Sequence, residues 1–324
     1  MGKTKEKNNN DRLGFGKLLL WNSRAVSSAI VTLMLGFLMI YCTDTLKVPP
    51  AYISVILVAS KILDGVTDMF AGFIVDRTRW GKARPYEIFI VAIWLCTWLL
   101  FSCPESFSMT AKLIWIFVMY ALANSVCYTF LNANGTSYMV RAFKSGEIVK
   151  QTSYGSIITM LAAVIFNITF PALMGSIATS GAGWSRLVLM FAVPLAAIGL
   201  LRMLFVPEKY DVDMETPDAE KLKVSDIFKL IRVNKYILII VLMTFVFNFV
   251  TNMGVVTYYY TYIVGNVGLM GITAAAQIIA LPLALFFPKL IARFSTVKLM
   301  MFGFCVSAFG YFLNFIAGGN VAFL

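Results

Sequence analysis

The stretch "KILDGVTDMFAGFIVDRTRWGKARPY", residues 61–86, decides the fold because it places charged side chains inside an apolar run. Lys61, Asp64 and Asp68 come first, and a basic cluster from Arg77 to Arg84 follows them. A charge at the centre of a membrane-spanning helix costs about 2.5–3.5 kcal/mol, so it must face protein or water. Charged residues at this depth indicate a permeation pathway.

The composition of the whole chain predicts an all-α polytopic membrane protein. Its 324 residues are 60% hydrophobic and 13% charged, whereas about a quarter of the residues of soluble domains are charged. The net charge of +11 is spread over short runs between apolar segments, which indicates orientation in a membrane rather than nucleic-acid binding. The chain has no histidine, so an imidazole proton relay or a histidine metal site is excluded. Its five scattered cysteines are expected to be free thiols.

Apolar runs of about 20 residues, the length that crosses a bilayer, recur along the chain. The predicted spans are 22–43, 50–75, 86–104, 112–140, 152–178, 185–206, 236–262, 267–290 and 298–320. Basic residues concentrate in alternate connections, which predicts that the N-terminus (1–21) and the polar segment 207–235 are cytoplasmic. We therefore expect a six-helix bundle over 22–206, a linker over 207–235, and a partial second bundle of three helices over 236–324.

Two connections between predicted spans suggest an internal duplication. Aligning Arg77, after the second span, with Arg293, after the eighth, also aligns Lys82 with Lys298. A duplicated architecture would hold twelve helices. The expectation is that this chain is truncated and lacks helices 10 to 12.

The charges of the second span predict a site for a cation. Lys61, Asp64 and Asp68 are spaced i, i+3 and i+7, which places them on one face of a helix. Two carboxylates and one ammonium carry a net charge of −1, and their oxygens suit a proton or a small hard cation. Thr67 adds a hydroxyl beside Asp68. The alternative is that Lys61 only neutralises one aspartate in an interhelical ion pair.

Neutral polar residues in the fourth and seventh spans are candidates for a solute site. Amides and phenols supply the donors and acceptors that a hydroxylated solute requires. The same groups also hydrogen-bond membrane helices to one another, and tyrosines form interfacial belts, so these two alternatives stay open. The residues are Asn124, Tyr128, Thr129, Asn132, Asn134, Asn248, Asn252, Tyr258, Tyr259, Tyr260 and Tyr262.

Four motifs together resemble the glycoside–pentoside–hexuronide:cation symporter family of the major facilitator superfamily. They are "YCTD" (41–44), the D-x-x-x-D of Asp64 and Asp68, "WGKARPY" (80–86) and "VTYYYTYIVGN" (256–266). The resemblance implies the major facilitator fold, here an N-terminal six-helix bundle plus the first three helices of the C-terminal bundle. It also implies that a cation and a solute share a cavity between bundles that rock to give alternating access.

The resemblance assigns roles to individual positions. It implies cation binding by Asp64, Asp68, Thr67 and Thr129. Lys61 stands where the family has an arginine, and Ser28, Asn132 and Thr136 stand where it has charged or aromatic sugar ligands, so the solute stays open. With the polar residues above, the expected solute-binding set is Lys61, Ser28, Tyr128, Asn132, Thr136, Asn248 and Asn252. A structural cytoplasmic loop is expected at Asp76, Arg77, Gly81, Lys82 and Arg84.

The predicted function is symport of a sugar or glycoside, coupled to Na⁺ or H⁺, across the plasma membrane by a monomeric multi-pass protein. Its partners would be the small-molecule solute and the lipid bilayer, with no nucleic acid and no cofactor beyond the coupling ion. One alternative is a non-transporting sensor or scaffold, or an inactive fragment. Another is a relative that carries lipids or other amphiphiles. An enzyme is not expected, because the sequence shows no nucleophile–base pair or metal-ligand set.

Overall fold

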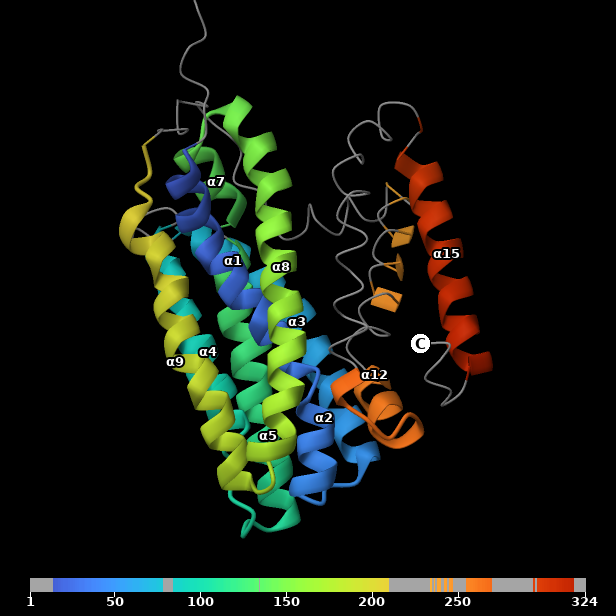
Figure 1. Ribbon diagram of the computed structural model, residues 1–324. Helices are drawn as coiled ribbons and strands as arrows, with labels where there is room; N and C mark the ends of the chain where they lie inside the picture. The colour runs from blue at the N-terminus through green and yellow to red at the C-terminus, as the bar shows by residue number, and fades with distance from the viewer. Residues whose placement is uncertain are drawn as a thin grey trace, which may run out of the picture.

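The computed structural model describes residues 14–77, 84–133, 135–209, 255–269 and 296–317, together with positions 234, 236, 238, 239, 242, 243, 245, 246 and 294. Every regular element within these residues is a helix (Figure 1). The predicted all-α class is therefore confirmed.

The described helices follow the predicted order of spans. The first rod contains α1 (Phe15–Leu35), α2 (Leu38–Ile40) and the π-helical turn η1 (Tyr41–Thr45), and α3 (Pro50–Arg77) follows. Next come η2 (Arg84–Ile88) with α4 (Phe89–Leu100), and then α5 (Met109–Ala121), η3 (Leu122–Tyr128), α6 (Thr129–Ala133) and α7 (Gly135–Ala142). The remaining helices are α8 (Ser145–Ile177), α9 (Gly181–Phe205), α12 (Val255–Tyr258) with η4 (Tyr259–Ile263), and α15 (Thr296–Ala317).

Five of the described helical stretches are long and apolar enough to cross a membrane. They are Phe15–Thr45, Pro50–Asp68, Met109–Ala142, Tyr154–Ile177 and Gly181–Phe205. The protein is accordingly a multi-pass membrane protein. The predicted span 267–290 and the linker 207–235 lie almost entirely outside the described residues.

Two helices begin earlier than the apolar runs predicted. α1 starts at Phe15 rather than at residue 22, and α8 starts at Ser145 rather than at residue 152. An ion pair holds the two starts together: Nζ of Lys17 lies 3.2 Å from Oε2 of Glu147. Burial raises the pKa of Glu147, but hydrogen bonds from the Lys144 amide and from Lys17 outweigh it and lower the pKa overall. Hydropathy could not find the start of α8, because polar contacts stabilise it.

The core lies where α1 packs against α8 and α9, and where α4 packs against α9 (Figure 1). The buried positions of α1 include Ile30, Val31 and Met34, and this helical spacing turns one face of α1 toward its neighbours. Aromatic side chains fill the end of this core near η1: the ring centroids of Phe37 and Phe170 lie 4.7 Å apart. Burial of these faces fixes the bundle that positions the polar residues described below.

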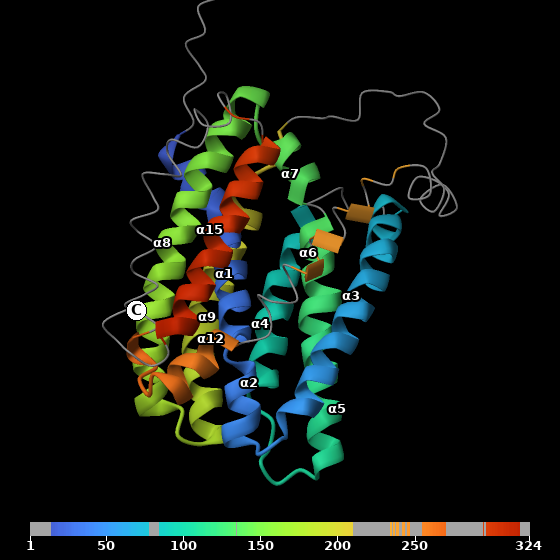
Figure 2. The same ribbon diagram turned by 90° about the vertical axis from the view of Figure 1, so that its right-hand side faces the viewer.

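α3 lies to one side of this core and packs against α5, η3 and α6 (Figure 2). It is less buried than α1, since only 17% of its apolar window is buried, compared with 61% for the first rod. The helix with the intramembrane charges therefore stands at the edge of the described bundle, where one of its faces is accessible.

A glycine allows α9 to approach two helices closely. A Cβ at Gly199 would lie 2.7 Å from Cγ1 of Ile90 and 2.9 Å from Oγ of Ser27. The Ser27 hydroxyl donates to the carbonyl of Leu195 at 2.7 Å and accepts from Nε1 of Trp94 at 2.8 Å. A side chain at position 199 would push on this junction of α1, α4 and α9.

We predict that Gly199→Ala lowers the free energy of unfolding by about 1–3 kcal/mol, the usual penalty of overpacking a core. The measurement is denaturant unfolding of the purified protein in detergent. The control is Gly175→Ala in α8, where a Cβ meets no atom within 4 Å. Equal stabilities of the two variants would contradict the close packing of α9.

Candidate cation and solute site

The charged residues of α3 gather around one hydroxyl from the neighbouring helix α6. Thr129, which is buried, donates from Oγ1 to Oδ1 of Asp68 at 2.8 Å, and Oδ1 of Asp64 lies 3.5 Å from the same hydroxyl. Lys61 Nζ lies 3.1 Å from the other oxygen, Oδ2, of Asp64. The structure thus brings together three of the four predicted cation ligands, although they come from segments about 65 residues apart.

The electrostatics of this cluster favour a cation. Two carboxylates and one ammonium have a formal net charge of −1, and the carboxylate oxygens converge on Thr129 Oγ1. Asp68 is exposed, whereas the side chains of Lys61 and Asp64 are 36% and 25% exposed. Oxygen donors with a net negative charge and an open side suit a proton or a small hard cation.

The fourth predicted ligand, Thr67, is placed differently. Its hydroxyl lies 2.9 Å from the carbonyl of Asp64 and 3.1 Å from that of Leu63, so it donates within α3. Nearby, the Ser125 hydroxyl donates to the carbonyl of Ser60 at 3.0 Å, which joins η3 to α3. This contact and the π-helical turn η3 place α6 so that Thr129 faces the carboxylates.

The predicted solute residues are spread over several environments. Asn132 is exposed, and its Oδ1 accepts a hydrogen bond of 2.9 Å from Nη2 of Arg24. Ser28 is buried and donates to the carbonyl of Ala25 at 3.2 Å. Tyr128 is half-buried against the apolar core, and Thr136 is exposed on α7. The remaining two, Asn248 and Asn252, lie outside the described residues.

The predicted cytoplasmic loop is only partly described. Asp76 and Arg77 end α3, and Gly81 and Lys82 lie outside the described residues. Arg84 connects η2 to the end of α9: its backbone amide donates to Glu208 Oε1 at 2.7 Å, and its Nη2 donates to the carbonyl of Leu204 at 3.0 Å.

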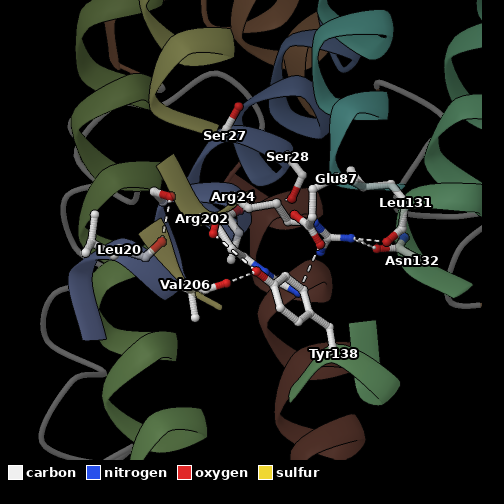
Figure 3. A network of polar contacts seen from close by, with 12 residues as sticks. Leu20, Arg24, Ser27, Ser28, Glu87, Leu131, Asn132, Tyr138, Arg202 and Val206 are labelled. Atoms are coloured by element: carbon white, nitrogen blue, oxygen red, sulfur yellow. Dashed lines mark hydrogen bonds and ion pairs between the residues drawn. The ribbon is translucent and has the colours of Figure 1, made fainter. Parts of the chain in front are cut away.

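The structure also contains a buried charged cluster that the sequence analysis did not identify (Figure 3). Glu87 Oε1 lies 3.1 Å from Nη2 of Arg202, and Glu87 Oε2 lies 3.8 Å from Nε of Arg24. The Arg202 guanidinium lies over the ring of Trp21, 3.7 Å from its centroid, and the Tyr138 hydroxyl donates to the Arg202 carbonyl at 3.2 Å. The criterion that identified Asp64, a charge inside an apolar span, also applies to these three residues.

The first rod also contacts the described part of the seventh predicted span. The hydroxyls of Thr43 and Tyr258 are 2.8 Å apart, and the Tyr262 hydroxyl donates to Asp44 Oδ1 at 2.7 Å. The rings of Tyr258 and Tyr262 stack with their centroids 5.5 Å apart. Two π-helical turns, η1 and η4, therefore meet at one end of the molecule, and both belong to motifs noted in the sequence (Figure 1).

Comparison with known proteins shows to which family the chain belongs. The sequence model of the family described as MFS/sugar transport protein matches residues 24–324. The uncharacterized symporter YnaJ of Bacillus subtilis is 30% identical over 88% of this chain and 63% of its own length. The isoprimeverose transporter of Lactiplantibacillus pentosus is 25% identical over 90% of this chain and 61% of its own length. The sodium-dependent lysophosphatidylcholine symporter 1 of Xenopus tropicalis is 27% identical, over 40% of this chain and 25% of its own. The chain thus spans about three fifths of the length of the first two relatives.

We predict that Thr129→Val weakens Na⁺ binding about tenfold, because it removes an oxygen donor beside the two carboxylates, but strengthens proton binding, because a carboxylate that loses a hydrogen-bond donor is protonated more easily. The measurement is the Na⁺ or proton concentration that half-saturates the thermal stabilisation of the purified protein. The control is Thr97→Val, since Thr97 is also buried and donates to Ile93 within its own helix. Unchanged binding in the Thr129 variant, or an equal loss in both, would contradict the assignment.

Proposed function

The chain belongs to the MFS/sugar transport protein family, and we propose that it couples the movement of Na⁺ or H⁺ to symport of a sugar or glycoside. The observation that carries the proposal is the convergence of Asp64 and Asp68 on the Thr129 hydroxyl, with Lys61 beside them. In the proposed mechanism the cation occupies this cluster. The family is one of transporters, so no enzymatic reaction is proposed.

The charge balance of the α3 cluster supports coupling to a cation. Without a bound cation, Asp64 and Asp68 hold two negative charges close together, and Lys61 offsets one of them. A bound Na⁺ or proton offsets the second, so that the loaded site is neutral when the bundles close over it. The cost of enclosing an uncompensated charge thus disfavours the conformational change of the empty transporter and links the movement of the cation to that of the solute.

Polar side chains beside the cation cluster support a hydroxylated solute. Asn132 follows Thr129 by three residues in α6, and both Asn132 and Thr136 are exposed. Amide and hydroxyl groups match the donors and acceptors of a sugar. The relative named as an isoprimeverose transporter supports a glycoside as the class of solute.

A second candidate solute is an amphiphilic lipid. Relatives from three vertebrates are named as sodium-dependent lysophosphatidylcholine symporters, and each matches about two fifths of this chain. The longer match to the isoprimeverose transporter, over 90% of this chain, favours the sugar. Uptake of lysophosphatidylcholine but not of a glycoside would select the lipid.

We place the protein in the plasma membrane with its N-terminus in the cytoplasm, from the alternation of basic connections. α1 then runs outward, and the contact between η1 and η4 lies at the extracellular ends of both helices. In this orientation the Thr43–Tyr258 and Asp44–Tyr262 hydrogen bonds hold the extracellular side closed. Their separation would open that side during alternating access.

We predict that Asp68→Asn abolishes solute accumulation driven by a Na⁺ or proton gradient in proteoliposomes, while exchange of external for internal solute persists. An amide keeps the size of the side chain but removes the charge that the coupling ion balances. The control is Glu105→Gln, because Glu105 is a carboxylate outside the cluster that accepts a hydrogen bond from the amide of Gly181. The assignment fails if the Asp68 variant accumulates solute like the parent protein.

We also predict that Tyr262→Phe opens the η1–η4 end. Loss of the hydrogen bond to Asp44 should shift the ratio of open to closed molecules about tenfold toward open. The measurement is the distance distribution between spin labels at Lys47→Cys and Ile263→Cys, in a background without native cysteines. Tyr311→Phe on α15 is the control, since Tyr311 is exposed. Identical distributions in the two variants would show that the phenol does not hold this end closed.

A further inference from the structure

The buried cluster of Arg24, Glu87 and Arg202 contains more positive than negative charge. Arginine stays protonated in proteins, so two guanidinium groups face one carboxylate, with a formal net charge of +1. The side chains of Arg24, Glu87 and Arg202 are 10%, 1% and 4% exposed. A buried charge without full compensation must be stabilised by neutral acceptors, which makes the neighbours of the two arginines informative.

Arg24 and Arg202 contact different neighbours. Arg202 takes the closer contact with Glu87, at 3.1 Å, and lies over the ring of Trp21. Arg24 lies 3.8 Å from Glu87, and its closer contacts are on α6, where Nη2 donates to the Leu131 carbonyl at 2.6 Å and to Asn132 Oδ1 at 2.9 Å (Figure 3). Arg202 therefore belongs to the interior of the bundle, whereas Arg24 extends from α1 to α6.

The contact with Arg24 fixes which way the Asn132 amide faces. A guanidinium only donates hydrogen bonds, so it selects the amide oxygen, and Nδ2 with its two hydrogens is directed to another acceptor. Asn132 is exposed, so that acceptor can come from outside the bundle. The same helix, α6, carries Thr129 three residues earlier, where it meets the two carboxylates of α3.

We propose that Arg24 is a positioning residue for the solute: it holds the amide of Asn132 so that Nδ2 donates to an acceptor oxygen of the solute. The inference rests on the proposed function, in which Asn132 contacts the solute. The excess positive charge of the cluster polarises the amide and strengthens this donor. A hydroxyl or ring oxygen of a glycoside supplies such an acceptor.

Two conservative substitutions separate positioning from simple packing. Arg24→Lys keeps the charge but loses the planar fork that reaches Glu87, Leu131 and Asn132 together. Arg202→Lys changes an equally buried member of the same cluster, whose contacts in the described part of the chain are with Glu87, Trp21 and Tyr138. Both variants should lower thermal stability, but only the first disturbs Asn132.

The test is equilibrium binding of radiolabelled isoprimeverose to the purified protein in nanodiscs. Binding is measured in two separate conditions, once at saturating Na⁺ and once at low pH. Arg24→Lys should weaken binding of this probe about tenfold, as expected for loss of a charge-assisted hydrogen bond, and leave cation affinity unchanged. Arg202→Lys should keep probe affinity within about twofold of the parent protein. In an Asn132→Ala background, Arg24→Lys should cause no further loss, because coupled residues are not additive.

Parent-like probe affinity in Arg24→Lys overturns the inference, and so does equal weakening in both arginine variants. Full additivity with Asn132→Ala also overturns it, since Arg24 would then act without Asn132. If the unsubstituted protein does not bind isoprimeverose at all, the proposed sugar class is wrong. The positioning role of Arg24, which depends on that class, is then wrong as well. The two failures are distinguishable, because the second is seen in the parent protein alone.

Discussion

The cost of placing a charge within a hydrocarbon layer governs how the described helices of this protein are assembled. Two clusters of charged side chains among these helices carry formal net charges of opposite sign. Lys61, Asp64 and Asp68 on α3 sum to −1, and Arg24, Glu87 and Arg202 sum to +1. The five-residue helix α6 (Thr129–Ala133) lies between them, contacting the carboxylates of α3 through Thr129 and Arg24 through Leu131 and Asn132. The two clusters are thus connected through a single short element.

In the proposed mechanism, this arrangement gives a physical route by which the cation site and the solute site affect each other. A change of charge at the α3 carboxylates acts on the Thr129 hydroxyl, and α6 carries that residue and Asn132 within one turn. The apolar packing of α1, α4, α8 and α9 holds Arg24 in place. Because Arg24 donates hydrogen bonds to α6, it fixes the position of α6 relative to that bundle. On the other side, η1 and η4 are joined by hydrogen bonds between Thr43 and Tyr258 and between Asp44 and Tyr262. Polar contacts of this kind separate more readily than a packed core.

Local patterns predicted the helices and one cluster, but not the contacts between distant segments. The apolar run predicted a span over 50–75, and α3 covers Pro50–Arg77, because a continuous apolar run of this length is itself the signal of a membrane-spanning helix. Helical spacing placed Lys61, Asp64 and Asp68 on one face. Thr129 as their partner came from the family resemblance, since spacing within one helix cannot specify a contact across 61 residues. Arg24, Glu87 and Arg202 were missed because each is a single charge near the end of its predicted span, and only tertiary pairing brings them together.

The most direct test of the central claim is an infrared difference spectrum of the protein, recorded on adding Na⁺ and, separately, on lowering the pH. Binding at the α3 cluster must change the stretching bands of its carboxylates, whether the ion is Na⁺ or H⁺. If the cation binds at Asp64 and Asp68, one of the two ions produces a carboxylate signal that is lost when both residues are replaced by asparagine. A signal that persists unchanged in that double variant would show that the cation binds elsewhere.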